Sequence, residues 1–426
     1  MVSDLSVEPD GGGGEKVGGR VRRGSGAVAY IFTTFPKATE TFLQREVAGL
    51  RSLGVELRLY SMWGGGGEFE GLPVTRFPKW RLATLVVRIP WLAVCHPHVV
   101  MELIRGVCSR KAPSRLNFFE NLLGLGFGLV YARHFRRFRP AHVHAVWGGG
   151  PATAAWLLWR LDGHPYSGAG HAYDLYQDGG DWWLKEKLEP ALFIHTSTEM
   201  GRRTLVEKGV ADEKIHVIRR GLGTLPRLKP LRTPRRPLRL LCVARLVPKK
   251  GLDHQMRIYA ALKAAGVEFE ARIAGEGPLH ASLGKLATEL GVANAVALLG
   301  HRPQTEIMEH LGWADVLLHT GVVAADGDRD GLPNVIPEAM SAGVLVVTSP
   351  AAATTEAIAD GETGRVALPE NAGEWVAILR ELRDDDAQAE RLRAAARAWV
   401  EANFDAVKNA SKLAGLYERL ISATSL

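Results

Sequence analysis

Cysteine is scarce in this sequence, which has only Cys95, Cys108 and Cys242 among 426 residues. Three scattered cysteines provide no disulfide framework, and this favours a reducing compartment. Long apolar runs are also absent: residues 82–104 come closest to a membrane span, but charged, proline and histidine residues interrupt them. The polar N-terminus lacks the basic-then-apolar order of a signal peptide. We therefore expect a cytoplasmic protein whose residues 1–25 form a disordered tail.

Several catalytic motifs are missing as well. The sequence has no G-x-S-x-G elbow, no Walker loop and no H-E-x-x-H motif. Residues 148–150 are all glycine and do not fit G-x-G-x-x-G, which argues against a nicotinamide-dependent dehydrogenase. Residues 326–331 (DGDRDG) imitate the start of a calcium loop, but Pro337 stands where that loop needs its last glutamate.

The histidines and cysteines do not form a metal motif either. Cys95 and His98 lie close together in sequence near Cys108, but no second tight pair completes a zinc set. His142 and His144 would share one face of a strand, with no cysteine nearby. We expect no metal site and no cofactor.

The composition is that of a globular protein with two domains. Apolar residues make up 46% of the chain and charged residues 23%, and the length suits two domains of about 150–200 residues. The net charge of +7 suits an anionic partner such as nucleotide, phospholipid or nucleic acid, and selects none of the three.

Short apolar runs typical of strands alternate with helical patterns along the whole chain. This alternation predicts an α/β fold with parallel sheets. Residues 223–237 are rich in proline and arginine and mark the boundary between two halves. We expect two Rossmann-like, doubly wound domains, residues 26–225 and 237–404, with a ligand cleft between them at the carboxyl ends of the strands.

The helical stretch 78–137 is rich in tryptophan, phenylalanine and arginine, and it ends in YARHFRRFRP. Its basic face suits either contact with water or a position near phosphate or a membrane surface, and the sequence favours water.

Residues 326–347 (DGDRDGLPNVIPEAMSAGVLVV) predict an acidic loop, a short helix and a strand. Asp330 lies on the loop and Glu338 on the helix, where a carboxylate suits sugar hydroxyls or a ribose diol. A buried Glu338 would need a ligand or a basic partner; the alternative is an exposed helix position. The amides of Asn334 and Val335 would favour negative charge at the start of this helix.

Residues 244–251 (ARLVPKKG) follow another predicted strand. Arg245 and Lys250 on this loop can both reach a diphosphate, although two cations beside a turn can also be merely solvated. His171 follows a predicted strand too. It is either a buried histidine with satisfied hydrogen bonds or a group that contacts a substrate, and Asp174 would orient it or make its own contact.

Six motifs form a recognisable series along the chain. They are FPKATETFLQRE (35–46), HVHAVWGGGPATAAWL (142–157), GHAYDLY (170–176), ARLVPKKGLD (244–253), IAGEGPL (273–279) and the stretch of residues 326–347. In this order they resemble the family 4 retaining glycosyltransferases of GT-B fold over residues 27–422. The similarity points to the bacterial enzymes of exopolysaccharide and colanic-acid-type assembly.

The resemblance implies roles for the residues that match the family's motifs. Asp330 takes the position near the donor hexose, where the family has glutamate, and Glu338 takes the position on the nucleotide ribose. Arg245 and Lys250 match the pair of residues with which the family binds the pyrophosphate. His171 matches a histidine that the family places close to the donor sugar. The catalytic set so implied is His171, Arg245, Lys250 and Asp330.

The remaining implied contacts surround this set. The donor side adds His301 and Arg302 near the nucleobase, together with Gly331, Leu332, Asn334 and Val335. The acceptor side comprises Glu40, Gly148, Gly149 and Asp174. The resemblance also implies that the final helix, about residues 405–426, packs back on the N-terminal domain.

The function so implied is metal-independent hexosyl transfer with retention, from a UDP- or GDP-linked sugar to a saccharide or polyprenyl-diphosphate-linked acceptor. The enzyme would work in the cytoplasm, at the inner face of the plasma membrane if its basic helices contact lipid, and would bind no nucleic acid. Two alternatives stay open: a sugar-nucleotide epimerase of the same fold, and a non-catalytic partner subunit that senses nucleotide sugars. Asp330 in place of glutamate is the feature that favours the second.

Overall fold

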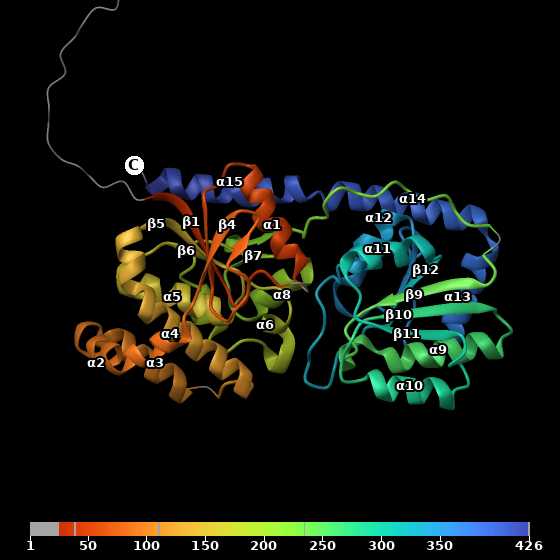
Figure 1. The fold of residues 1–426 in the computed structure, drawn as a ribbon, viewed down its shortest axis with the longest axis horizontal. Helices are drawn as coiled ribbons and strands as arrows, with labels where there is room; N and C mark the ends of the chain where they lie inside the picture. The colour runs from red at the N-terminus through yellow and green to blue at the C-terminus, as the bar shows by residue number, and fades with distance from the viewer. Residues whose placement is uncertain (1–24, 38–39, 110, 234, 425–426) are drawn as a thin grey trace, which may run out of the picture.

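A computed structural model describes residues 25–37, 40–109, 111–233 and 235–424. The expected tail therefore lies outside the described residues, apart from Ser25, which begins the first strand. The described chain forms two α/β domains side by side (Figure 1).

The N-terminal domain is built on an eight-stranded sheet of order β3-β4-β2-β1-β5-β6-β7-β8. All neighbouring strands are parallel except β3 and β4, which form an antiparallel hairpin. The central strands are apolar and buried, as a parallel sheet covered on both faces requires. Its strands are β1 (Ser25–Phe32), β2 (Leu57–Ser61), β3 (Glu68–Phe69), β4 (Leu72–Arg76), β5 (Pro140–Ala145), β6 (Tyr166–Ala169), β7 (Ile194–Thr196) and β8 (Ile215–Val217).

Helices cover both faces of this sheet. The longest, α4, is capped by the Ser114 hydroxyl, which accepts a hydrogen bond from the Asn117 amide. The helices are α1 (Thr41–Ser52), the 3-10 turn η1 (Lys79–Thr84), α2 (Leu85–Cys95), α3 (Pro97–Ser109), α4 (Arg115–Phe138), α5 (Gly150–Asp162), α6 (Tyr173–Tyr176), η2 (Gln177–Gly179), α7 (Leu184–Leu188), α8 (Glu199–Glu207) and η3 (Asp212–Lys214).

The C-terminal domain has a six-stranded, wholly parallel sheet of order β11-β10-β9-β12-β13-β14. Its strands are β9 (Leu238–Val243), β10 (Phe269–Ala274), β11 (Val296–Gly300), β12 (Val316–His319), β13 (Leu345–Thr348) and β14 (Arg365–Val366). Its helices are η4 (Pro248–Lys250), α9 (Leu252–Ala264), α10 (His280–Glu289), α11 (Gln304–Trp313), α12 (Val335–Ala342), η5 (Ala352–Glu356), α13 (Ala372–Asp384) and α14 (Asp386–Asn403).

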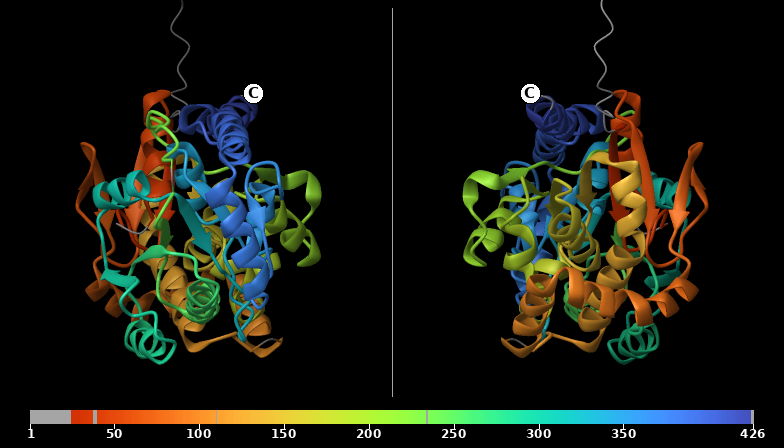
Figure 2. Two further views of the ribbon diagram at one scale, coloured as in Figure 1. Left: turned by 90° about the vertical axis from the view of Figure 1, so that its right-hand side faces the viewer. Right: turned by 90° about the vertical axis from the view of Figure 1, so that its left-hand side faces the viewer.

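The last helix, α15 (Ala406–Thr424), returns to the N-terminal domain. It continues the line of α14 across the molecule (Figure 1) and lies beside the first strand and helix in the end-on views of Figure 2. The Tyr417 and Tyr30 hydroxyls are hydrogen-bonded at 2.8 Å, and Leu413 is completely buried in the same apolar cluster. The chain therefore crosses between the two domains twice.

The predicted α/β class with two doubly wound domains is confirmed. Two features differ in detail from the sequence expectation. The β3–β4 hairpin was not expected, because its strands are short and its glycine-rich surroundings give no periodic signal. The helical stretch 78–137 is divided into η1, α2, α3 and α4, since Pro97 and the 111–114 segment interrupt it.

Among the described residues, no single helix is long and apolar enough to cross a bilayer. The segments Lys79–Cys95 and Pro97–Cys108 reach that length and apolarity only together, with a bend of 108° between them.

Candidate active site

The loop of residues 320–334, which follows β12, brings the two domains together. The Asp178 amide of the N-terminal domain donates a hydrogen bond of 2.8 Å to the Asp326 carbonyl. A Cβ atom on Gly331 would lie only 3.1 Å from the His171 carbonyl oxygen. Residues 171–178 follow β6, so loops at the carboxyl ends of both sheets meet here, where doubly wound folds bind their ligands.

Two lysines and a histidine surround Asp330 on this loop. Its carboxylate lies 2.5 Å from the Lys250 ammonium and 3.4 Å from the Lys249 ammonium, with the His319 imidazole at 3.8 Å. Burial alone would raise the pKa of Asp330, but Lys250, His319 and Lys249 hold that pKa well below its ordinary value. The carboxylate is therefore ionised and ion-paired before any ligand arrives.

Lys249 is a site residue that the sequence did not indicate. Its side chain is buried, and its ammonium also lies 2.9 Å from the Asp328 carboxylate. The motif ARLVPKKG contains two adjacent lysines, and only their placement on the η4 turn reveals that both reach the acidic loop. Asp328, excluded as a calcium ligand by the sequence, instead serves as a partner for this lysine.

The lysine turn is held against the loop after β12 by a close backbone approach. Gly251 has a φ of +56°, and a Cβ atom there would lie 2.1 Å from the Thr320 carbonyl oxygen. Only glycine fits both the backbone angle and this distance. Arg245, at the start of the same segment, is exposed and forms no ion pair within the described chain. Its guanidinium is thus available to an anion.

Glu338 lies buried on α12 and has a basic partner from the other domain. The Arg45 guanidinium approaches its carboxylate at 3.2 Å. Burial raises the pKa of Glu338, and Arg45 and Gln304 partly offset that shift. The sequence expectation that a buried Glu338 needs a ligand or a basic partner is met here by Arg45.

A second arginine reaches the start of α12. Arg220 donates a hydrogen bond to the Asn334 side chain at 3.2 Å, and its guanidinium lies over the Phe42 ring at 3.8 Å. Leu332 and Val335 are buried in the core behind the helix, so they position its backbone. Arg45 and Arg220 add positive charge from the N-terminal domain to the amides of this helix end.

His171 is buried against the aromatic rings of Trp147 and Phe42 and the imidazole of His195. Burial, followed by the charges of His195 and Arg220, lowers its pKa well below the ordinary value. Neither ring nitrogen has a hydrogen-bond partner among the described residues. His171 is therefore a neutral imidazole with a free donor and a free acceptor beside the interface.

Asp174 fixes two of the predicted site loops to each other. Its carboxylate accepts hydrogen bonds from the amides of His171, Ala172 and Gly148 at 2.9–3.0 Å. It is completely buried. Of the two roles open from sequence, orienting the His171 loop is the one that this geometry provides.

Glu120 on α4 is a second carboxylate that the sequence did not indicate. Its Oε1 accepts hydrogen bonds from Tyr173 at 3.0 Å and Thr33 at 3.1 Å, and a Cβ atom on Gly149 would lie 3.1 Å from it. Burial, and then the charge of Asp181, raise its pKa. Within an apolar helical stretch a single glutamate gives no motif, so only the fold identifies it.

The remaining predicted residues lie at the edges of this site. Glu40 forms an exposed ion pair with Lys37 at 2.7 Å. His301 is exposed just after β11, two strands away from β9, and Arg302 lies 3.5 Å from Glu306. These residues lie at the carboxyl ends of the strands, as the site does. Within the described chain, no interaction joins them to the lysine–aspartate cluster.

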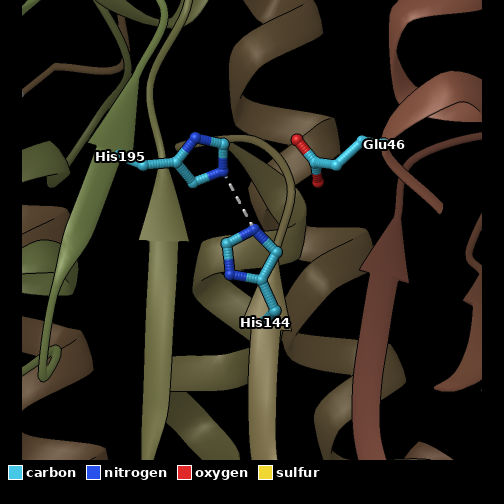
Figure 3. A group of neighbouring side chains, drawn as sticks. All are labelled: Glu46, His144 and His195. Atoms are coloured by element: carbon cyan, nitrogen blue, oxygen red, sulfur yellow. Dashed lines mark hydrogen bonds between the residues drawn. The ribbon is translucent and has the colours of Figure 1, made fainter. Parts of the chain in front are cut away.

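Glu46, His144 and His195 form a polar cluster in the N-terminal domain (Figure 3), and the His195 ring lies 5.3 Å from the ring of His171. The Nε2 atoms of His144 and His195 are 3.2 Å apart, and the Glu46 carboxylate lies within 4.8 Å of both. A cavity of about 20 Å³, room for one water molecule, borders Glu46 and His195. Sequence reasoning considered His144 together with His142, whereas the fold pairs it with two residues distant in sequence.

Comparisons with known proteins show which family and which solved structures this chain is similar to. Residues 228–399 match the family described as Glycosyl transferases group 1. The chain is 36% identical over 224 residues to the amylovoran biosynthesis glycosyltransferase AmsK of Erwinia amylovora, covering 52% of this chain and 55% of AmsK. It is 27% identical over 368 residues to the putative colanic acid biosynthesis glycosyltransferase WcaL of Escherichia coli K12, covering 81% of this chain and 87% of WcaL. The AmsK match thus spans about half of that protein.

Solved structures share the whole fold at low identity. A glycosyltransferase from Rickettsia africae superposes with a TM-score of 0.67 at 16% identity, over 93% of this chain and 99% of that one. HepE from Anabaena in complex with UDP-glucose gives 0.66 at 17% identity, over 94% and 100%.

The chain has the GT-B fold of these solved structures. Residues 228–399 match the glycosyl transferases group 1 family, and the resemblance to exopolysaccharide glycosyltransferases that the motifs carry is confirmed.

The Glu46 carboxyl makes the stability of the fold depend on pH. Burial raises its pKa from 4.5 to about 7, although Tyr30 and Arg220 act in the opposite direction. The folded protein therefore holds this proton to a higher pH than the unfolded chain, and loses stability as the pH rises from about 4.5 to about 7. Glu46→Gln removes this loss. Urea unfolding should show the variant gaining about 1–3 kcal/mol relative to wild type between pH 5 and pH 8. If the difference in free energy of unfolding between Glu46→Gln and wild type is the same at pH 5 and at pH 8, this explanation is wrong.

Proposed function

We propose that this chain transfers a hexose from a nucleoside-diphosphate sugar, UDP- or GDP-linked, to a saccharide or polyprenyl-diphosphate-linked acceptor in exopolysaccharide assembly. The observation that carries this proposal is the cationic cluster of Lys249 and Lys250 beside the start of α12, inside a group 1 domain. The names of AmsK and WcaL, both exopolysaccharide glycosyltransferases, support the pathway. UDP-glucose in the HepE structure supports a nucleotide-sugar donor.

The lysines would exchange partners when the donor binds. In the structure, Lys249 and Lys250 are neutralised by Asp328 and Asp330. A diphosphate offers a greater negative charge than either carboxylate and can be bound by both lysines, by exposed Arg245 and by the amides of Asn334 and Val335. These groups would stabilise the charge that develops on the leaving diphosphate, so the reaction needs no metal.

The release of Asp330 from its lysines would then give the hexose a carboxylate partner. Asp330 is one methylene shorter than glutamate, and its oxygens are close to the lysine turn, so the donor hydroxyls that it reaches must be close to the diphosphate. Neutral His171 has a free donor and acceptor for the sugar from the opposite domain. With no protein nucleophile proposed, attack on the same face as departure would retain the anomeric configuration.

On the acceptor side, Glu120 lies close to Gly149, beside the turn whose Gly148 amide donates to Asp174. We include it with Glu40 and Asp174 in the proposed acceptor side, where Asp174 acts by holding the turn. A carboxylate whose pKa is raised can accept a proton from an acceptor hydroxyl more readily than an ordinary one.

A non-catalytic nucleotide-sugar sensor is the second candidate. One observation favours it: both Asp330 oxygens face lysines, so the carboxylate that the family uses for the hexose is engaged. A sensor would bind the donor and release no nucleoside diphosphate. An epimerase of the same fold has no specific observation in its favour.

Loss of one diphosphate partner should slow turnover. Arg245→Ala and Lys250→Ala should each lower kcat for transfer by about 10²–10³, as removal of one electrostatic stabiliser does. The control is Lys285→Ala, because Lys285 is an exposed lysine on α10 away from this cluster. Nucleoside-diphosphate release under saturating donor measures the effect. Full activity in both site variants would refute the assignment.

Loss of the proposed ribose contact should weaken donor binding. Glu338→Ala should raise the donor Kd by about 10–100-fold, since a hydrogen bond to a charged group contributes about 1.5–3 kcal/mol. Calorimetry with the donor measures this, and Glu309→Ala, an exposed glutamate on the neighbouring helix α11, is the matched control. An unchanged donor Kd in Glu338→Ala would exclude the ribose role.

A further inference from the structure

Exposed apolar side chains are concentrated in one region of the N-terminal domain. In the described part of the chain 20 large apolar side chains are exposed, and 13 of them lie between residues 80 and 122. We call this set the apolar face; it consists of Trp80, Val86, Val87, Ile89, Trp91, Val94, Met101, Ile104, Val107, Leu116, Phe118, Phe119 and Leu122. Single exposed apolar residues need no explanation, but a set of this size marks an interaction surface.

The apolar face is built from η1, α2, α3 and the first two turns of α4. Helices α2 and α3 lie at the outer end of the N-terminal domain, on the side away from the C-terminal domain (Figure 1). Leu92 and Val99 on their inner sides are buried in the domain core, so the helices are anchored there. Val86 and Val94 are nevertheless 78% and 81% exposed. The core is thus already satisfied by the inner residues, and Val86 and Val94 project from it into solvent.

Positive charge accompanies this face. From Lys79 to Arg115 the sequence contains seven lysines and arginines and one acidic residue, Glu102. Glu102 is ion-paired with Arg160 at 2.6 Å, which leaves the basic excess uncompensated. Lys79, Arg81, Arg105, Lys111 and Arg115 are exposed among the apolar side chains. Trp80 is 72% exposed, and tryptophan is the residue that favours the boundary between lipid headgroups and acyl chains.

We propose that the apolar face docks on the surface of an anionic phospholipid bilayer. Apolar side chains would enter the headgroup region, while lysines and arginines pair with lipid phosphates. A second copy of this chain is a poorer occupant, because two such faces would bring like charges together. The bend of 108° between the α2 and α3 segments suits helices that lie in the interface rather than cross it.

This docking deepens the proposed function and rests on it only for the lipid-linked acceptor. Helix α4 connects the two surfaces directly: Phe118 and Phe119 belong to the apolar face, and the next residue, Glu120, contacts Thr33 and Tyr173 at the proposed acceptor side. A hollow lined by Lys111, Arg115, Phe118 and Phe119 opens beside them. A polyprenyl-linked diphosphate could therefore stay in the bilayer while its saccharide reaches the site.

Flotation with vesicles tests this docking on the whole 426-residue chain. Vesicles of phosphatidylcholine with about one third phosphatidylglycerol should carry wild type, and pure phosphatidylcholine vesicles should carry much less. The triple variant Val86→Ser, Val87→Ser, Val94→Ser should bind at least tenfold more weakly, because it removes three exposed apolar side chains. Arg105→Gln with Lys111→Gln should weaken binding by about fivefold per charge, and added salt should reduce that difference.

The matched control replaces three exposed apolar residues outside the face: Val206→Ser, Leu368→Ser and Val407→Ser. It should float like wild type. The proposal is overturned if the Val86/Val87/Val94 variant floats as well as wild type. It is also overturned if light scattering shows that wild type dimerises through this face while it does not bind vesicles. Nucleoside-diphosphate release in vesicle-free solution separates the two claims. Variants that no longer dock should still release nucleoside diphosphate in solution. If the proposed function is wrong, wild type will release none but will still float with the vesicles.

Discussion

The ion pairs of Lys249 and Lys250 with Asp328 and Asp330 are the interaction on which the rest of this site depends. They join the loop after β9 to the loop after β12. Buried charges persist only when they are paired, so the two lysines and the two aspartates stabilise one another and hold both loops in place. The close approach at Gly251 makes this possible, because the lysine turn packs directly on Thr320. The loop after β12 then meets the His171 loop of the other domain.

The same ion pairs explain why the site is stable without a ligand. Four charges would otherwise lie near each other in a partly dry interface. Replacement of the carboxylates by a diphosphate keeps the lysines paired and frees Asp330 and Asp328 for other contacts. Arg45 with Glu338 repeats this arrangement in the first turn of α12. Each acidic group of the proposed donor side therefore has a protein cation as its partner in the structure.

Sequence reasoning predicted much of the fold, because strand and helix periodicities are local properties. The alternation of strand and helix patterns predicted the parallel sheets, and the proline- and arginine-rich segment 223–237 does lie between the last strand of the first sheet and the first strand of the second. The β3–β4 hairpin was not predicted, because strands of two and five residues beside glycines are too short to show an alternation of apolar and polar residues. Asp330, Lys250 and His171 were indicated by motif, and the structure brings their loops together.

The residues that sequence reasoning missed are those whose importance comes from distant contacts. Lys249 looked like the neighbour of a ligand residue, and only the turn geometry shows it buried against Asp328. Glu120 and Arg220 lie outside every motif, and Arg45 lies in the motif of residues 35–46 but was given no role there. All three matter because another segment approaches them. The apolar face is a similar case. The basic character of residues 78–137 was visible in the sequence, but exposure of the apolar side chains required the packing of α2 and α3 on the core.

The measurement that tests the central claim most directly is nucleoside-diphosphate release from a panel of UDP-, GDP- and ADP-hexoses, with and without a lipid extract as acceptor. If the lysine–aspartate cluster is a donor site of a glycosyltransferase, one nucleotide class will release diphosphate, and the lipid extract will accelerate that release. Binding of a nucleotide sugar without release in either condition would contradict the account and identify the chain as a sensor.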